Sequence, residues 1–208
     1  MPDLNAIKTK AAEMSAVCLE MWQTAFKCFM EHDLDLLSKA LEYEVKLNNL
    51  EKEITSDLIE LSRYCIEKEE KSKALIYADA AGDLELIGDY CKDILERVQI
   101  KIEEKLLFSD EAVEEYKELY DKTENALREI VTALERDDLS LIKEVLKDEE
   151  HIDSLVDEYR KKHNQRVIEG VCKPFACNMF INMLDFTAVV YYHAKKIARS
   201  LLNINKIK

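Results

Sequence analysis

The amino-acid sequence predicts an all-α protein, built as two tandem antiparallel three-helix bundles with six long helices. Only three glycines and two prolines occur in the 208 residues, which leaves few turns for a sheet protein. Hydrophobic residues make up 48% of the chain, enough to bury a core. They recur at helical spacing over long stretches, and one such stretch occurs twice.

The helical spacing of apolar residues defines six segments, which are residues 3–31, 33–67, 70–105, 109–136, 138–169 and 173–203. Asp33 and Asp138 are suitable N-caps, and Ser109 precedes two acids at a further helix start. Gly170 followed by Pro174 predicts a stop and a restart. Short links between long helices favour antiparallel neighbours.

Segments two and five are copies of each other. The stretch "HDLDLLSKALEYEVKLNNLEKEI" from His32 aligns without gaps with "DDLSLIKEVLKDEEHIDSLVDEY" from Asp137. Because each copy has one helix before it and one after it, we predict two bundles, residues 1–107 and residues 108–208.

The charge balance narrows the functional class. The formal net charge of −13 opposes a general role on nucleic acid or anionic membranes. Cations or basic protein surfaces are the favoured partners. We expect a soluble cytoplasmic protein, since no signal peptide is visible and the longest apolar run, residues 175–192, contains Asn178, Asn182 and Asp185. The six cysteines lack C-x-x-C spacing, which favours reduced core thiols over zinc binding or disulfides.

Acidic and amide side chains interrupt the apolar stripe of the repeated segments. Glu44 and Asn48 fall inside the stripe of segment two, and Glu149 and Asp153 take the equivalent places in segment five. A carboxylate turned toward a core costs several kcal/mol unless a proton, a basic group or a metal ion compensates it. Pairs on facing helices could present up to four oxygens to magnesium, manganese or iron. Alternatively, these side chains lie at the stripe edge and reach solvent or a lysine.

The stretch "GDLELIGDYCKDI", residues 82–94, supplies a candidate facing pair. Glu85 and Asp89 are spaced i and i+4, so they share one face of segment three. Gly82 and Gly88 each cost about 1 kcal/mol of helix stability, and we expect them to permit close helix packing. The strongest apolar stripe of this segment lies opposite, so a solvated pair is the alternative.

The same stretches carry a family resemblance. "GDLELIGDYCKDI" resembles the "LERIGDHAxNI" signature of PhoU proteins, and "LEYEVKLNNLEKEI" and "KDEEHIDSLVDEY" resemble their ExxxD helix. The order of motifs along nearly the whole chain is similar to the PhoU-like cytoplasmic domain of sodium-dependent phosphate cotransporters. The resemblance implies two three-helix bundles and multinuclear metal sites. The metal is iron in several members, with manganese, magnesium and zinc as alternatives.

The resemblance also implies function and site residues. PhoU proteins are non-enzymatic adaptors that restrain phosphate transport through a transporter or its ATPase subunit and report to a sensor histidine kinase. A homodimer is compatible with this, and membrane association is expected through the transporter only. By position the implied metal residues are Glu44, Asn48, Glu85 and Asp89 in the first bundle, and Glu149 and Asp153 in the second.

The chain departs from the family pattern at several of these places. Asn48 replaces an aspartate, Leu86 replaces the signature arginine, and Ala188 and Tyr192 stand at the acid positions of the last helix. Asp185 and His193 are additional candidate ligands that could substitute in the second bundle.

Other functions are compatible with parts of the pattern. A ferritin-like di-iron enzyme needs Glu-x-x-His pairs, and none of the four histidines has a glutamate three residues before it. A metal-free helical scaffold with incidental inward acids is the main rival. The basic stretch "YRKKHNQR", residues 159–166, is either a docking surface or a helix end that favours bases through its dipole.

Overall fold

The structure is a computed structural model that describes residues 3–63, 67–136, 138, 140–147, 151–172, 174–204 and 206–207. Its helices are α1 (Leu4–Glu31), α2 (Leu34–Ser62), α3 (Lys68–Glu103), α4 (Asp110–Arg136), α5 (Ile142–Val145), α6 (His151–Ile168) and α7 (Pro174–Ile204). The described residues contain helices and no strand, so the predicted all-α class is confirmed. None of these helices is both long enough and apolar enough to span a membrane.

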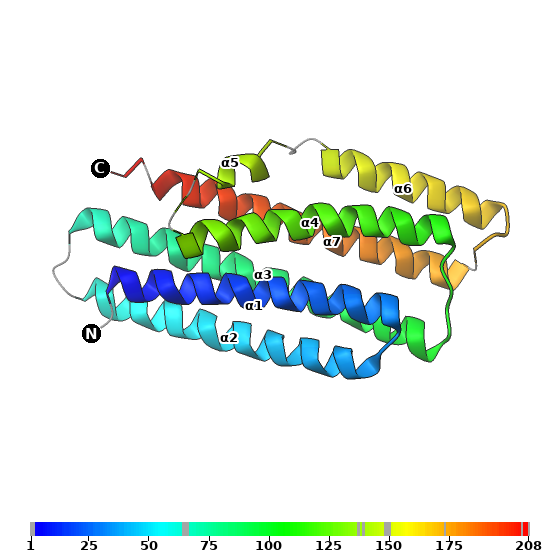
Figure 1. The fold of residues 1–208 in the computed structure, drawn as a ribbon, viewed down its shortest axis with the longest axis horizontal. Coiled ribbons are helices and arrows are strands. Elements are labelled where there is room, and N and C mark those ends of the chain that lie inside the picture. Colours follow the sequence, from blue (N-terminus) through cyan, green and yellow to red (C-terminus); the bar gives the residue numbers. More distant parts are fainter. Residues whose placement is uncertain are drawn as a thin grey trace.

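The helices form two groups that lie side by side along the long axis of the molecule (Figure 1). Helices α1, α2 and α3 pack against one another, and α4 and α6 pack against α7. Helix α3 also packs along α7 and α1 along α4, so the two groups share one continuous core. Residues 104–109 link the groups, at the place where the sequence predicts the boundary between bundles.

Aromatic rings fill the contact between α1 and α4. The ring of Phe26 stacks on that of Tyr120 at 3.7 Å between centroids, and Trp22 stacks on the same tyrosine at 5.5 Å. Phe29 meets the edge of Tyr116 at 5.0 Å. Burial of such large rings is a major favourable term in folding.

The observed helix ends follow the predicted capping chemistry at two places. The side chain of Asp33 accepts a hydrogen bond from the backbone N–H of Asp35 and caps α2. Gly170 adopts a φ of 73° just after α6, a left-handed conformation that favours glycine. Pro174 then begins α7.

The prediction of one continuous helix over residues 138–169 is wrong. The short α5 ends at Val145, and α6 begins at His151. Apolar residues keep their helical spacing on both sides, with Ile142 and Val145 buried before the interruption and Ile152 buried after it. The charged stretch "KDEE" between them offers no apolar side chain to bury, so the spacing alone does not reveal the break.

Of the six cysteines, Cys18, Cys28, Cys91 and Cys177 are buried and free, and Cys172 is half-buried and free. Cys65 lies outside the described residues. Burial raises the pKa of the Cys18 thiol to about 12, which keeps it protonated and unreactive at neutral pH. These four buried thiols agree with the prediction of reduced core cysteines.

Candidate functional site

Acidic side chains of α2 and α3 face each other along the first helical group. We call this set the acidic face, and it comprises Glu44, Glu51, Glu85 and Asp89. Glu44 is half-buried, and its Oε1 accepts a hydrogen bond from Nδ2 of Asn48 at 3.1 Å. The same oxygen lies 3.4 Å from Nζ of Lys92 on α3. The helices therefore bring together the four first-bundle residues that the sequence singles out, and they add Glu51 and Lys92.

The carboxylates of the acidic face destabilise one another's charge. Burial raises the pKa of Glu85, and the charges of Asp89, Glu51 and Glu44 raise it further. Asp89 is exposed at the surface; partial burial of its carboxylate and the charge of Glu44 raise its pKa, against the opposing effect of Lys92. A site where carboxylates repel in this way favours a proton or a cation.

The donor set of the acidic face suits a hard divalent cation, since its members are carboxylate and amide oxygens. Its geometry is not that of an assembled metal centre. Among the residues that the structure describes, no three acidic, histidine or cysteine side chains are grouped closely enough to hold a metal ion. Lys92 already supplies a positive charge to Glu44. A cation would therefore bind here only if the side chains rotated toward it.

The second helical group does not present the corresponding pair. Asp153 is exposed, whereas its neighbours Ile152 and Val156 are buried, so the expectation that Asp153 points inward is wrong. Ile152, Val156 and Tyr159 form the buried stripe of α6, and Asp153 lies beside that stripe on the solvent side. Glu149 lies outside the described residues.

The two additional candidates, Asp185 and His193, each contact a different partner. Asp185 of α7 accepts a hydrogen bond from Arg160 of α6. The side chain of His193 is 13% exposed and contacts Asp83 of α3, with 2.9 Å between Nδ1 and Oδ1. The structure therefore does not bring Asp185 and His193 together with the acidic face.

Asp83 is a buried residue that sequence reasoning missed. Its side chain is 2% exposed, and its Oδ1 also accepts a hydrogen bond from Nζ of Lys196 at 2.7 Å. An acid buried to this degree is retained when basic partners hold it. Its position on the buried face of α3, beside Leu84 and Ile87, was the sequence signal that could have found it.

The basic stretch over residues 159–166 is mostly engaged within the molecule. Arg166 forms two hydrogen bonds with the carboxylate of Glu115 on α4, at 2.9 and 2.5 Å. Nζ of Lys162 lies 2.5 Å from Glu158, and the hydroxyl of Tyr159 donates to Glu118. His163 is fully buried and stacks on Phe180. These contacts favour an internal role for the stretch over the docking interpretation.

Lys101 is a second buried charge that sequence reasoning missed. Its side chain is 4% exposed, and its Nζ contacts Nε2 of His32 at the turn between α1 and α2. The amine lies 4.7 Å from the ring centre of Phe29 and 5.7 Å from that of Phe108 in the linker. Burial lowers the pKa of Lys101 to about 8. Lys101 therefore joins three connected segments at one end of the molecule.

The two glycines of the opening stretch differ in their surroundings. A Cβ added at Gly88 would meet Cδ1 of the fully buried Leu47 at 2.7 Å, so α2 packs closely on α3 at this glycine and a larger residue would have to displace Leu47. A Cβ added at Gly82 would meet nothing within 4 Å. The expectation of close packing is confirmed at Gly88 and wrong at Gly82.

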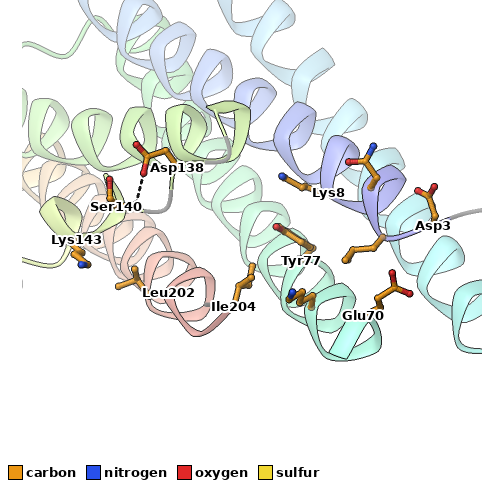
Figure 2. A pocket seen from close by; sticks show the side chains of 12 residues that line it. Asp3, Lys8, Glu70, Tyr77, Asp138, Ser140, Lys143, Leu202 and Ile204 are labelled. Atoms are coloured by element: carbon orange, nitrogen blue, oxygen red, sulfur yellow. Dashed lines mark hydrogen bonds between the residues drawn. The ribbon is translucent and has the colours of Figure 1, made fainter. Parts of the chain in front are cut away.

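A pocket of about 750 Å³ lies at the end of the molecule opposite Lys101, between the starts of α1 and α3 and the end of α7 (Figure 2). Charges of both signs line it, with Asp3, Glu70 and Asp138 among the acids and Lys8, Lys73 and Lys143 among the bases. Such a mixed lining selects neither an anion nor a cation. None of the residues that line it belongs to the acidic face.

The sequence of the chain is similar to those of PhoU proteins. The family model of the PhoU domain matches residues 11–98. The phosphate-specific transport system accessory protein PhoU homolog 1 of Thermotoga maritima is 33% identical over 86 residues, which are 41% of this chain and 36% of that relative. The sequence match thus spans about a third of the length of that curated relative.

Solved structures extend the likeness to the whole fold. PhoU from Pseudomonas aeruginosa matches with a TM-score of 0.90 at 18% identity, over 98% of this chain and 97% of the other. The phosphate transport system regulatory protein PhoU from Streptococcus pneumoniae matches with a TM-score of 0.83 at 12% identity, over 99% and 96%. The chain therefore resembles the PhoU domain in sequence over residues 11–98 and has the fold of solved PhoU structures over nearly its whole length.

Proposed function

We propose that this protein regulates phosphate transport by binding other proteins. The observation that carries the proposal is the PhoU domain match over residues 11–98, combined with the PhoU fold over nearly the whole chain. The two relatives named above are an accessory protein and a regulatory protein of phosphate transport systems. By this likeness the chain is an adaptor and carries out no reaction of its own.

The proposed partners are a phosphate transporter or its ATPase subunit and a sensor histidine kinase. All of these present cytoplasmic surfaces, so the proposal locates the chain in the cytoplasm, at the membrane only through the transporter. The acidity of the chain supports binding to basic protein surfaces, since complementary charge steers association.

Cation binding at the acidic face is a separate part of the proposal. Glu44, Glu85 and Asp89 would hold the ion, with Asn48 beside them. The raised pKa values of Glu85 and Asp89 support it, because a bound divalent ion would relieve the repulsion between their charges. Manganese, magnesium and iron are the candidate ions, with zinc as a further alternative. The second group is a weaker candidate because Asp153 is exposed and its predicted partner Glu149 lies outside the described residues.

Affinity capture tests the proposed partners. The tagged chain is expressed in its source cells, membranes are solubilised in mild detergent, and captured proteins are identified by mass spectrometry. Enrichment of phosphate-transporter subunits or of a phosphate-sensing kinase, relative to an untagged strain, is the expected result. Capture of neither class in phosphate-rich or phosphate-poor cells would contradict the proposal.

A further inference from the structure

Exposed apolar side chains occur in three connections between helices that all lie at one end of the molecule. We call this end the apolar tip, and its residues are Met30, Leu34, Leu107, Ile168, Val171 and Phe175. They belong to the α1–α2 turn, the α3–α4 linker and the α6–α7 turn, which all lie at the same end of the long axis (Figure 1). Leu107 is 83% exposed and Ile168 is 79% exposed, among the highest values of the large hydrophobic residues described.

Contacts beneath the tip hold the three connections together. The ring of Phe108 in the linker lies 6.0 Å from that of Phe29 on α1 and 5.5 Å from that of Phe180 on α7. Lys101 joins the end of α3 to His32 in the α1–α2 turn. The apolar tip is therefore supported by packed side chains and does not rest on an isolated loop.

The three connections that form the tip carry an excess of acidic residues. The three connections, residues 30–35, 103–111 and 168–175, carry eight acids against two lysines. Glu31, Glu104, Asp110 and Glu169 are exposed among these acids. An apolar centre with a polar, charged rim is the usual composition of a protein interface.

This charge selects among possible occupants of the tip. Two copies of the chain meeting tip to tip would bring two strongly acidic rims together, and an anionic lipid surface would be repelled in the same way. A protein surface that presents apolar side chains flanked by lysine or arginine is complementary to both the apolar side chains and the acidic residues of the tip.

We infer that the apolar tip is the docking surface for such a partner, a basic-rimmed apolar patch on a component of the phosphate transport or sensing machinery. The inference rests on the proposed function and specifies which surface carries it. The acidic face lies along α2 and α3, away from the three connections, so docking and cation binding use different parts of the molecule.

Two matched double variants test the inference by the affinity capture described above. Leu107→Ser/Val171→Ser removes exposed apolar side chains from the tip, and Ile59→Ser/Leu75→Ser removes exposed apolar side chains from α2 and α3 at the opposite end. Thermal unfolding should be the same for both, because all four side chains are exposed. We expect the tip variant to recover transporter or kinase subunits about tenfold less efficiently than the control variant, which should equal the wild type.

A charge variant tests the stated chemistry of the partner. Glu104→Gln/Glu169→Gln should weaken capture and reduce its dependence on salt concentration, since fewer charges would then be screened. Unchanged capture by both the tip variant and the charge variant would overturn the inference while leaving the proposed function in place. Failure of the wild-type chain to capture any phosphate-transport or kinase subunit would instead overturn the proposed function, and this partner with it.

Two further results would reassign the tip. If the tip joined two copies of the chain, analytical sedimentation would show self-association of the wild type, and the tip variant would abolish it. Co-sedimentation with phosphatidylserine-containing vesicles, lost in the tip variant, would show a membrane surface as the occupant. Either result would overturn the inference, and we expect neither.

Discussion

Nδ1 of His193 on α7 lies 2.9 Å from Oδ1 of Asp83 on α3, and this contact joins the two helical groups inside their shared interface. The carboxylate must accept the proton of the imidazole N–H, and it also accepts a hydrogen bond from Lys196. Because Asp83 is almost fully buried, the basic side chains stabilise a charge that would otherwise be costly.

Replacing Asp83 should weaken the packing between the two groups. Asp83→Ala leaves the half-buried His193 without this partner, and we expect the free energy of unfolding to fall by about 2 kcal/mol. Asp79→Ala, an exposed position one turn earlier on α3, should change it by less than about 0.5 kcal/mol. Equal urea midpoints for the two variants would show that the buried contact contributes nothing to stability.

The two glycines of α3 should respond oppositely to alanine. Gly88→Ala places a methyl group against Leu47, and we expect a net loss of about 1 kcal/mol, since the clash outweighs the gain in helix propensity. Gly82→Ala meets no neighbour and should gain up to about 1 kcal/mol. Chemical unfolding of both variants provides the comparison. A gain at Gly88 would mean that α2 and α3 can separate without cost.

Lys101 should make stability depend on pH above neutrality. Its pKa is about 8 in the folded protein and near its usual 10.5 in the unfolded chain. Between these values the unfolded chain binds more protons, so the unfavourable contribution of Lys101 is full below pH 8 and declines as the pH rises toward 10.5. From pH 7 to pH 9 the wild type should gain about 1 kcal/mol relative to Lys101→Met.

The comparison with Lys101→Met cancels the titration of buried thiols and tyrosines, which both proteins share. Urea unfolding at pH 7, 8 and 9 measures the difference. A difference that stays constant with pH would show that Lys101 is solvated in the folded state.

The acidic face should bind a divalent ion that its two α3 carboxylates help to hold. Elemental analysis of protein purified without chelator is expected to show near-stoichiometric iron or manganese, lost in Glu85→Ala/Asp89→Ala. Asp79→Ala/Glu96→Ala removes two exposed acids from the same helix and should retain the metal. Metal absent from all three proteins would remove this part of the proposal and leave a metal-free regulatory protein.

Neutralising the carboxylates of Glu85 and Asp89 should raise the stability of the metal-free protein. The pKa values of Glu85 and Asp89 are raised in the folded state, so their charges destabilise it more strongly as the pH rises above the unfolded pKa values. Glu85→Gln/Asp89→Asn should therefore melt at a higher temperature than the wild type at pH 7 in the presence of chelator. A lower melting temperature would show that these carboxylates make favourable contacts that the charges alone do not describe.

Periodicity and end signals were sufficient to predict the long helices, because amphipathic spacing reflects which face is buried. The same signals failed where α5 gives way to α6, since apolar spacing on both sides of residues 146–150 continues across the break. The duplicated sequence therefore produces one unbroken α2 in the first group and two shorter helices in the second.

The candidate site was predictable only on the helices whose register is regular. Glu44, Asn48, Glu85 and Asp89 share a face because α2 and α3 are continuous. The pairing of Asp83 with His193 depends on how α3 packs against α7, which no local spacing encodes.

The central claim is that the chain regulates phosphate transport, and radiolabelled phosphate uptake tests it most directly. Uptake is measured in phosphate-rich medium in source cells that lack the chain, and in the same cells supplied with the wild type or with Leu107→Ser/Val171→Ser. We predict unrestrained uptake without the chain, restraint by the wild type, and loss of restraint in the tip variant. Identical uptake with and without the wild-type chain would contradict the account.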